Sequence, residues 1–193
     1  MALLGLLSIT LPRAVQASTI TYTESATASG ALDGTPFTNS LVTLSLTGDT
    51  SSIFAISGGF QINGTATVSV SGGGSDTFSD LIGVYVFNAF AGFTDVTRRN
   101  IAIFGDSSSP SFVGYGLATA LGPISNSVTD FNLNTPFNTT GGSFDMTALS
   151  GNATFTAAPA PEPSSLFMLA TGLGLLGFLA RKTLARDSSL ICS

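Results

Sequence analysis

The side chains that could carry chemistry in this chain are almost all carboxylates. Between Ser18 and Ala160 the sequence has one glutamate and eight aspartates, which are Glu24, Asp33, Asp49, Asp76, Asp80, Asp95, Asp106, Asp130 and Asp145. A glycosidase needs two carboxylates on opposite sides of a cleft. With nine acids, some pair could always be proposed as catalytic, so their presence is weak evidence for a glycosidase. Aspartates are also common because they stabilise turns. We therefore predict no catalytic residue and no enzyme, and keep a secreted hydrolase as the least favoured alternative.

The composition excludes several other kinds of site. The chain has no histidine and no tryptophan, and its single cysteine is Cys192. Ser-His-Asp and Cys-His catalytic arrangements therefore cannot form, and neither can zinc sites built from histidine and cysteine. An internal disulfide bond is impossible with one cysteine. We expect no cofactor.

The glycine-rich segment GGGSDTFSD, residues 72–80, is a candidate metal site, and the short loops at Asp49 and Asp106 are equally ambiguous. Asp76 and Asp80 could hold Ca²⁺ together with loop carbonyls, because this ion takes six to eight oxygen ligands. The segment occurs once, and its spacing does not follow the calcium-binding repeat G-G-x-G-x-D. A glycine-rich hairpin turn is the simpler interpretation, so we predict a turn and no metal site.

Charge is sparse and unevenly distributed along the chain. Residues 18–160 contain nine acids and only two basic residues, Arg98 and Arg99, for a formal charge of −7. A domain this acidic repels phosphate backbones, so nucleic acid is not an expected partner. The arginine pair could contact an acidic polysaccharide, but an exposed loop before the segment IAIF is the simpler prediction.

The elements that must position these side chains are predicted to be strands. Alternation with a period of two marks a strand with one buried face. In FQINGTATVSV, Phe60 to Val70, the apolar residues fall on one face and the polar residues on the other. LVTLSLT, residues 41–47, alternates in the same way, and LIGVYVF, residues 81–87, is apolar on both faces and is predicted to be a central strand.

The fold class predicted from these runs is all-β, an antiparallel β-sandwich or jelly-roll-like domain. Eight to ten short strands are expected, separated by turn signals such as DGTP, SGG and TGG. IAIF and FVGYGLA, residues 101–104 and 112–118, are further strand candidates, while ITY and ATFTA, residues 20–22 and 153–157, are expected at sheet edges. Serine and threonine should line the wet face. A β-solenoid is the alternative, but no fixed repeat supports it.

The N-terminal segment has the layout of a secretory signal peptide. An apolar run over residues 2–11 is followed by small residues at Val15 and Ala17, the −3 and −1 positions of a cleavage site before Ser18. No basic residue precedes the apolar run, which a start codon placed too far downstream would explain. We predict a signal peptide over residues 1–17, truncated at its N-terminus, and cleavage between Ala17 and Ser18.

The C-terminal segment combines three features in order. A proline-rich break over residues 157–165 contains Pro161, Glu162 and Pro163, and proline favours an extended, exposed chain. Fifteen uncharged residues from Leu166 to Ala180 follow; as a helix they would span about 22 Å, less than the roughly 30 Å hydrocarbon core of a bilayer. The basic residues Arg181, Lys182 and Arg186 come next, and the positive-inside rule places them in the cytoplasm.

This ordered tail resembles a PEP-CTERM sorting signal over residues 158–186. The resemblance implies that Pro161, Glu162 and Pro163 form the recognition motif of an exosortase, a membrane-embedded processing enzyme with a catalytic cysteine. It also implies export in a Gram-negative bacterium, an inner-membrane intermediate with a single short transmembrane helix, and a link to exopolysaccharide and biofilm matrix. Residues 187–193 extend beyond the usual signal as a short tail.

The resemblance leaves the middle of the chain, residues 18–157, without a molecular role. We predict an extracytoplasmic domain that reaches the outer surface or matrix and acts there as a structural or interaction component, with exopolysaccharide as a possible partner. The first alternative is a lectin-like module. Without tryptophan, such a module would depend on tyrosine and phenylalanine, and Tyr22, Tyr85 and Tyr115 are all predicted to lie in strands.

Overall fold

The computed structural model describes residues 18–106 and 108–160, and leaves out the side chains of residues 129 and 130. The predicted signal peptide, Pro-Glu-Pro motif, apolar helix and basic cluster therefore lie outside the described residues, and of the predicted cleavage site only Ser18 is described. Within the described part, no helix is long and apolar enough to cross a membrane.

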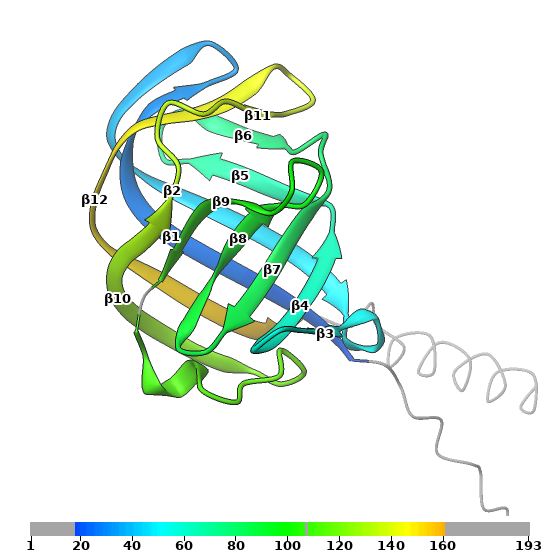
Figure 1. Cartoon of the computed structure of the whole chain (residues 1–193). Coiled ribbons are helices and arrows are strands. Elements are labelled where there is room, and N and C mark those ends of the chain that lie inside the picture. The colour runs from blue at the N-terminus through cyan, green and yellow to red at the C-terminus, as the bar shows by residue number, and fades with distance from the viewer. Residues whose placement is uncertain (1–17, 107, 161–193) are drawn as a thin grey trace, which may run out of the picture. The chain divides into compact units, whose positions relative to one another are not determined.

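The described chain consists of twelve strands and two short 3-10 helices (Figure 1). The strands are β1 (Thr19–Leu32), β2 (Thr35–Asp49), β3 (Phe54–Ile56), β4 (Gly59–Gly64), β5 (Ala66–Val70), β6 (Gly74–Thr77), β7 (Ile82–Phe87), β8 (Phe90–Asp95), β9 (Ile101–Asp106), β10 (Leu121–Phe131), β11 (Phe137–Asn138) and β12 (Ser143–Pro159). The 3-10 helices are η1 (Thr50–Ser52) and η2 (Pro110–Phe112). The prediction of an all-β fold is confirmed.

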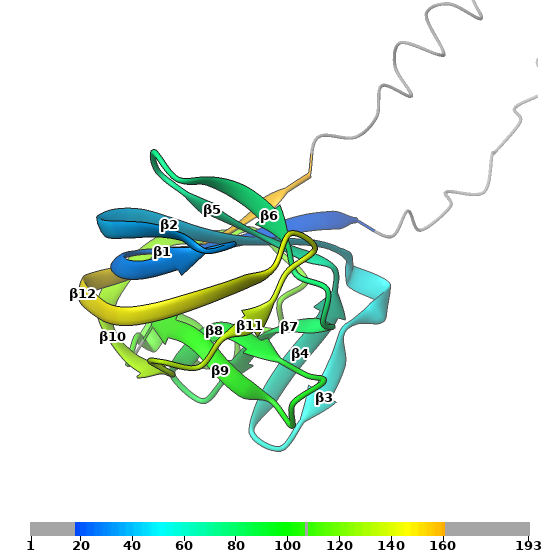
Figure 2. The ribbon, with the colours of Figure 1, turned by 90° about the horizontal axis from the view of Figure 1, so that it is seen from above.

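All strand pairs are antiparallel and belong to one continuous sheet. The strand order is β3-β4-β7-β8-β9-β10-β12-β1-β2-β5-β6, and β11 pairs with β12. Figure 2 shows that this sheet is curled into two layers, with β1, β2, β5, β6 and β12 in one and β3, β4, β7, β8 and β9 in the other. The predicted sandwich thus takes the form of a curled antiparallel sheet rather than two separate sheets.

The chain passes between the layers at both edges. β10 pairs with β12 through Leu121 to Ser127 and with β9 through Val128 to Phe131. At the other edge β4 pairs with β7, and after Thr65 the chain continues as β5, which pairs with β2. The predicted alternation over Phe60 to Val70 continues through this bend, so the same set of side chains stays inside in both layers.

The core lies between the two layers and is closed at one end by a loop. Phe112 in η2 packs edge-on against Phe155 in β12, with ring centroids 5.5 Å apart. The Tyr22 hydroxyl in β1 donates a hydrogen bond of 2.6 Å to the Leu117 carbonyl oxygen in this loop. Phe112 and Leu117 are both fully buried, and burial of one such side chain contributes about 1.5–3 kcal/mol. The loop is therefore part of the core.

Three details of the predicted strand pattern are wrong. Residues 20–22 and 153–157 lie in β1 and β12, which are central neighbours in the sheet rather than edge strands. FVGYGLA forms η2 and a loop, because Gly114 and Leu117 have φ values of +75° and +62°, which strands do not allow. Four strands have 11 to 17 residues, so the predicted short strands underestimate the sheet.

Candidate functional site

The outward surfaces of the two layers differ in chemistry. On the layer that contains β1 and β2, outward positions carry hydroxyl side chains in register, as in the pairs Thr21–Thr47 and Thr23–Ser45. The Thr21 and Thr47 hydroxyl oxygens are 2.8 Å apart. This is the wet Ser/Thr face that the sequence predicted.

The layer of β3, β4, β7, β8 and β9 carries a different outward surface. One cross-strand row runs from β3 to β9 through the paired residues Phe54, Gln61, Tyr85, Gly92 and Gly105. A second row contains Ile56, Gly59, Phe87 and Phe90. We call this the aromatic face, and none of the residues in its two rows is charged.

Glycines make the aromatic face flat enough for a tyrosine ring to lie across it. A Cβ atom added to Gly92 would be 2.7 Å from the Gly105 Cα and 3.1 Å from the Tyr85 hydroxyl oxygen. A Cβ atom added to Gly105 would be 2.6 Å from the Ala91 carbonyl oxygen and 3.2 Å from the same hydroxyl. Tyr85 therefore rests on two glycines, where any larger side chain would push both the ring and the neighbouring strand away.

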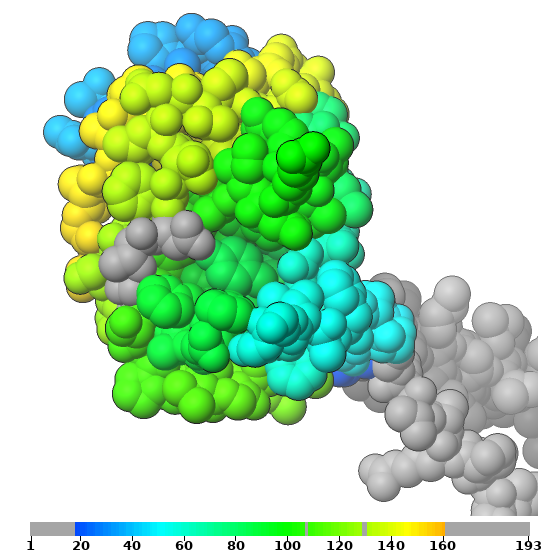
Figure 3. Space-filling model, viewed as in Figure 1, coloured from blue at the N-terminus to red at the C-terminus, as the bar shows by residue number. Residues whose placement is uncertain are grey.

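The aromatic face contains a groove of about 360 Å³. Ile56 and Ser57 at the β3–β4 turn line one end, and Asn100 before β9 lines the other, with Tyr85 and Phe87 between them. Figure 3 shows this side of the molecule, with a recess between the cyan β3–β4 region and the green β8–β9 turn. Its volume falls within the roughly 300–1,000 Å³ of small-molecule sites.

Amide side chains supply the polar part of the groove. The Gln61 side-chain nitrogen donates a hydrogen bond of 2.7 Å to the Asn63 side-chain oxygen. A Cβ atom on Gly83 would come within 2.8 Å of the first and 2.9 Å of the second, so this glycine leaves the space that both amides occupy. Asn100 adds a further amide to the lining, whereas the hydroxyl oxygen of the lining residue Thr94 is buried.

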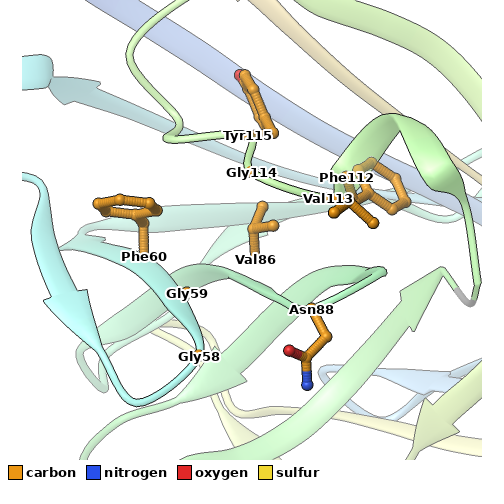
Figure 4. A pocket seen from close by; sticks show the side chains of 9 residues that line it. All are labelled: Gly58, Gly59, Phe60, Val86, Asn88, Phe112, Val113, Gly114 and Tyr115. Carbon is orange, nitrogen blue, oxygen red and sulfur yellow. The ribbon is translucent and has the colours of Figure 1, made fainter.

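A second, smaller pocket of about 200 Å³ lies between the β3–β4 turn and the loop after η2. Figure 4 shows Phe60, Val86 and Phe112 among its lining side chains. The Tyr115 hydroxyl in its lining donates 2.6 Å to the Thr119 carbonyl oxygen. The volume is below the usual range of ligand pockets, so we assign it no ligand.

Two of the aspartates weighed for metal binding or hydrolysis anchor a hairpin. Asp76 accepts hydrogen bonds from the Thr140 hydroxyl and from the Gly141 backbone N–H, the latter at 2.6 Å. These donors hold the pKa of Asp76 well below its ordinary value. Asp33 accepts a hydrogen bond of 2.6 Å from Thr139. The carboxylates thus tie the turn between β11 and β12 to β6 and to the β1–β2 turn.

The predicted glycine-rich hairpin turn is present between β5 and β6. Asp80, which follows β6, accepts 2.8 Å from the Asn138 side chain. Among the described residues, no three acidic, histidine or cysteine side chains are grouped so as to hold a metal ion.

Three other carboxylates are buried. Glu24 and Asp95 are fully buried and Asp106 is 1% exposed. Asp95 forms an ion pair of 2.7 Å with Arg98, and the Asn126 side chain donates 3.4 Å to Asp106. None of these acids lines either pocket, so the arrangement of two carboxylates across an open cleft is not found among these side chains.

The two arginines have different roles. Besides forming its ion pair, Arg98 lies with its guanidinium carbon 4.8 Å from the centre of the Phe137 ring. Its charge therefore interacts with groups of the domain itself. Arg99 is exposed in the β8–β9 turn, as the sequence predicted for the pair.

The two ends of the folded part lie side by side. Ile20 in β1 pairs with Pro159 in β12, and the Ala160 backbone N–H donates 2.8 Å to the Thr19 carbonyl oxygen. The Ser18 carbonyl accepts a hydrogen bond of 3.1 Å from the Thr50 N–H. Sequence-predicted processing sites therefore flank the first and last residues of the sheet, although the motif itself lies outside the described residues.

The groove was not predicted from the sequence. Two features of the sequence could have indicated the groove. One is LIGVYVF, where Tyr85 and Phe87 alternate with buried valines, and the other is the set of glycines in β7, β8 and β9. The interpretation of that run as apolar on both faces missed that one face is open to solvent.

Comparison with known proteins gives one match, and it is confined to the end of the chain. A family model described as the PEP-CTERM protein-sorting motif matches residues 159–182. Neither a curated protein nor a solved structure matches the chain. The chain thus carries a PEP-CTERM protein-sorting motif at its C-terminal end, which implies an exported protein that an exosortase-type enzyme recognises and processes.

Proposed function

We propose that this chain delivers its β-domain to the outer surface or extracellular matrix of a Gram-negative bacterium. The signal peptide directs export, the segment Leu166 to Ala180 holds an inner-membrane intermediate, and the exosortase-type enzyme acts near Pro161, Glu162 and Pro163. The single observation that carries this proposal is the sorting motif at residues 159–182.

The position of the sheet supports processing at this place. The last backbone hydrogen bond of the described sheet is made by Ala160, the residue immediately before Pro161. A cut at or after the Pro-Glu-Pro triplet would therefore keep every described strand in the released domain. A cut between Ala17 and Ser18 would likewise remove no residue of these strands. In our proposal the released domain is a non-enzymatic structural or interaction component of the envelope or exopolysaccharide matrix.

The test is the intact mass of the protein in fractions of the native host. We expect the surface fraction to contain a species that has lost residues 1–17 and everything beyond the Pro-Glu-Pro triplet. A triple change of Pro161, Glu162 and Pro163 to alanine should trap the longer form in the inner membrane.

A matched control is the triple change of Thr183, Asp187 and Ser188 to alanine, which lies beyond the matched motif and should leave processing unchanged. A wild-type protein that keeps Leu166 to Ser193 in every fraction would overturn the proposal. Equal processing of the two triple variants would also overturn it.

A further inference from the structure

We propose that the groove on the aromatic face is a binding site for an uncharged polysaccharide or its oligosaccharides. This site is independent of sorting, because it is built by β3, β4, β7, β8 and β9 and would exist in a protein with any C-terminal tail.

The aromatic residues provide the first half of the chemistry. Sugar rings present C–H groups on their faces, which pack favourably against aromatic rings, and the hydroxyl groups at their edges remain free for hydrogen bonds. Phe87 is 41% exposed although it lies on a central strand of the layer. Tyr85 lines the same groove and is held flat by the two glycines beneath it.

The polar residues provide the second half. Side-chain amides can donate and accept at the same time, as sugar hydroxyl groups do. Gln61, which is 5% exposed, and Asn100 contribute amides to the lining, and Ser57 contributes a hydroxyl group. A site with aromatic surface and a few neutral hydrogen-bonding groups matches an uncharged, hydroxyl-rich ligand better than a purely apolar one.

Charge distinguishes between sugar polymers. None of the groove's lining residues is ionisable near neutral pH, and residues 18–160 carry a formal charge of −7. A polyanionic polysaccharide would be repelled by this field. Arg99 lies next to Asn100, but one exposed arginine does not offset nine acids, so the ligand class is the uncharged one.

The site is formed in advance of binding. Its floor consists of strands, and the amide of Gln61 is already oriented by its hydrogen bond to Asn63. On β7 the groove is lined by Tyr85 and Phe87, which lie two residues, roughly 7 Å, apart at the usual rise of a strand. A groove of this size takes a short segment of a sugar chain whose other units remain in solvent.

The experiment is affinity electrophoresis of the full chain in detergent, in native gels that contain a soluble polysaccharide. The uncharged probes are mixed-linkage glucan, dextran, galactomannan and xyloglucan, and the anionic probes are alginate and polygalacturonate. We expect retardation by at least one uncharged polymer, with affinity about tenfold weaker in Phe87→Ser, as for a central contact residue.

Phe131→Ser is the matched control, because Phe131 is also 41% exposed but does not line the groove. Gln61→Leu, which keeps the volume of the side chain but removes its amide, should weaken binding while the thermal midpoint shows that the fold is intact. Failure of all four uncharged polymers would overturn the proposal.

Two other results would overturn it as well. These are equal binding by Phe87→Ser and Phe131→Ser, and retardation by the anionic polymers alone with dependence on Arg99. Failure of this proposal leaves the mass test of sorting unaffected, so the two can be distinguished.

Discussion

The glycines under Tyr85 allow the packing of the aromatic face to be tested with one added methyl group. In Gly105→Ala the new Cβ would lie 2.6 Å from the Ala91 carbonyl oxygen and 3.1 Å from the Gly92 Cα. The first contact is shorter than a Cβ can make and involves backbone, so β8 and β9 must move apart. Overpacking of this kind costs about 1–3 kcal/mol, and the small gain from replacing a strand glycine does not offset it.

The matched control is Gly64→Ala, also at a strand glycine. Here the nearest atom to the new Cβ would be the Leu46 Cγ at 3.5 Å, an ordinary contact. Replacing glycine where alanine fits stabilises a protein by about 0.4–1 kcal/mol, mainly because the unfolded chain loses conformational freedom. The two variants should therefore shift stability in opposite directions.

The assay is thermal unfolding of the full chain in detergent, followed by circular dichroism in the far ultraviolet. For a chain of this length, each kcal/mol moves the midpoint by roughly 2–4 °C. We expect a lower midpoint for Gly105→Ala and a higher midpoint for Gly64→Ala. A Gly105→Ala protein as stable as Gly64→Ala would refute the argument that the aromatic face needs a glycine at this position.

Four further predictions concern hydrogen bonds and charge. Tyr22→Phe should lower the free energy of unfolding in urea by about 1–3 kcal/mol, because the buried Leu117 carbonyl loses its donor; an unchanged urea midpoint would contradict this. Burial also raises the pKa of Tyr22 to about 12. Its neutral form therefore stabilises the fold below pH 10, and this contribution is lost as the pH rises through 12. The free energy of unfolding should fall less between pH 10 and pH 12 in Tyr22→Phe than in the wild type. The lowered pKa of Asp76 means that its ionised form stabilises the fold above the ordinary carboxyl pKa of about 4 and that the contribution is lost as the pH falls below it. Asp76→Asn should thus flatten the acid side of the stability profile, and an unaltered acid slope would count against the hairpin anchor. Arg98→Ala should destabilise the protein by about 1.5–3 kcal/mol, because it leaves a buried aspartate without its charged partner. Arg99→Ala should change the free energy of unfolding by no more than about 0.5 kcal/mol. Equal urea midpoints of the two variants would contradict the different roles assigned to the two arginines.

Local patterns in the sequence were sufficient for the strand class and for the sorting motif. Alternation with a period of two depends only on the geometry of an extended chain, so it correctly placed Ile62, Val68 and Leu44 in the core. The tail could be recognised because its three parts are contiguous in the chain, and the family match to residues 159–182 confirms it.

Tertiary structure decided what local patterns do not contain. The same alternation continues through the bend from β4 to β5. Periodicity alone therefore does not reveal that the run from Phe60 to Val70 contributes strands to two layers. The positions of β1 and β12 in the centre of the sheet follow from pairing between residues more than 100 positions apart, which no local signal encodes.

The groove is the clearest case of this division. Gln61, Tyr85, Gly92 and Gly105 lie on four different strands and become one row only through the register of those strands. The sequence by itself determined an exported all-β protein with a sorting tail. Only the folded sheet decided which of its faces is aromatic and open, because that depends on which strands pair and not on the composition of any one of them.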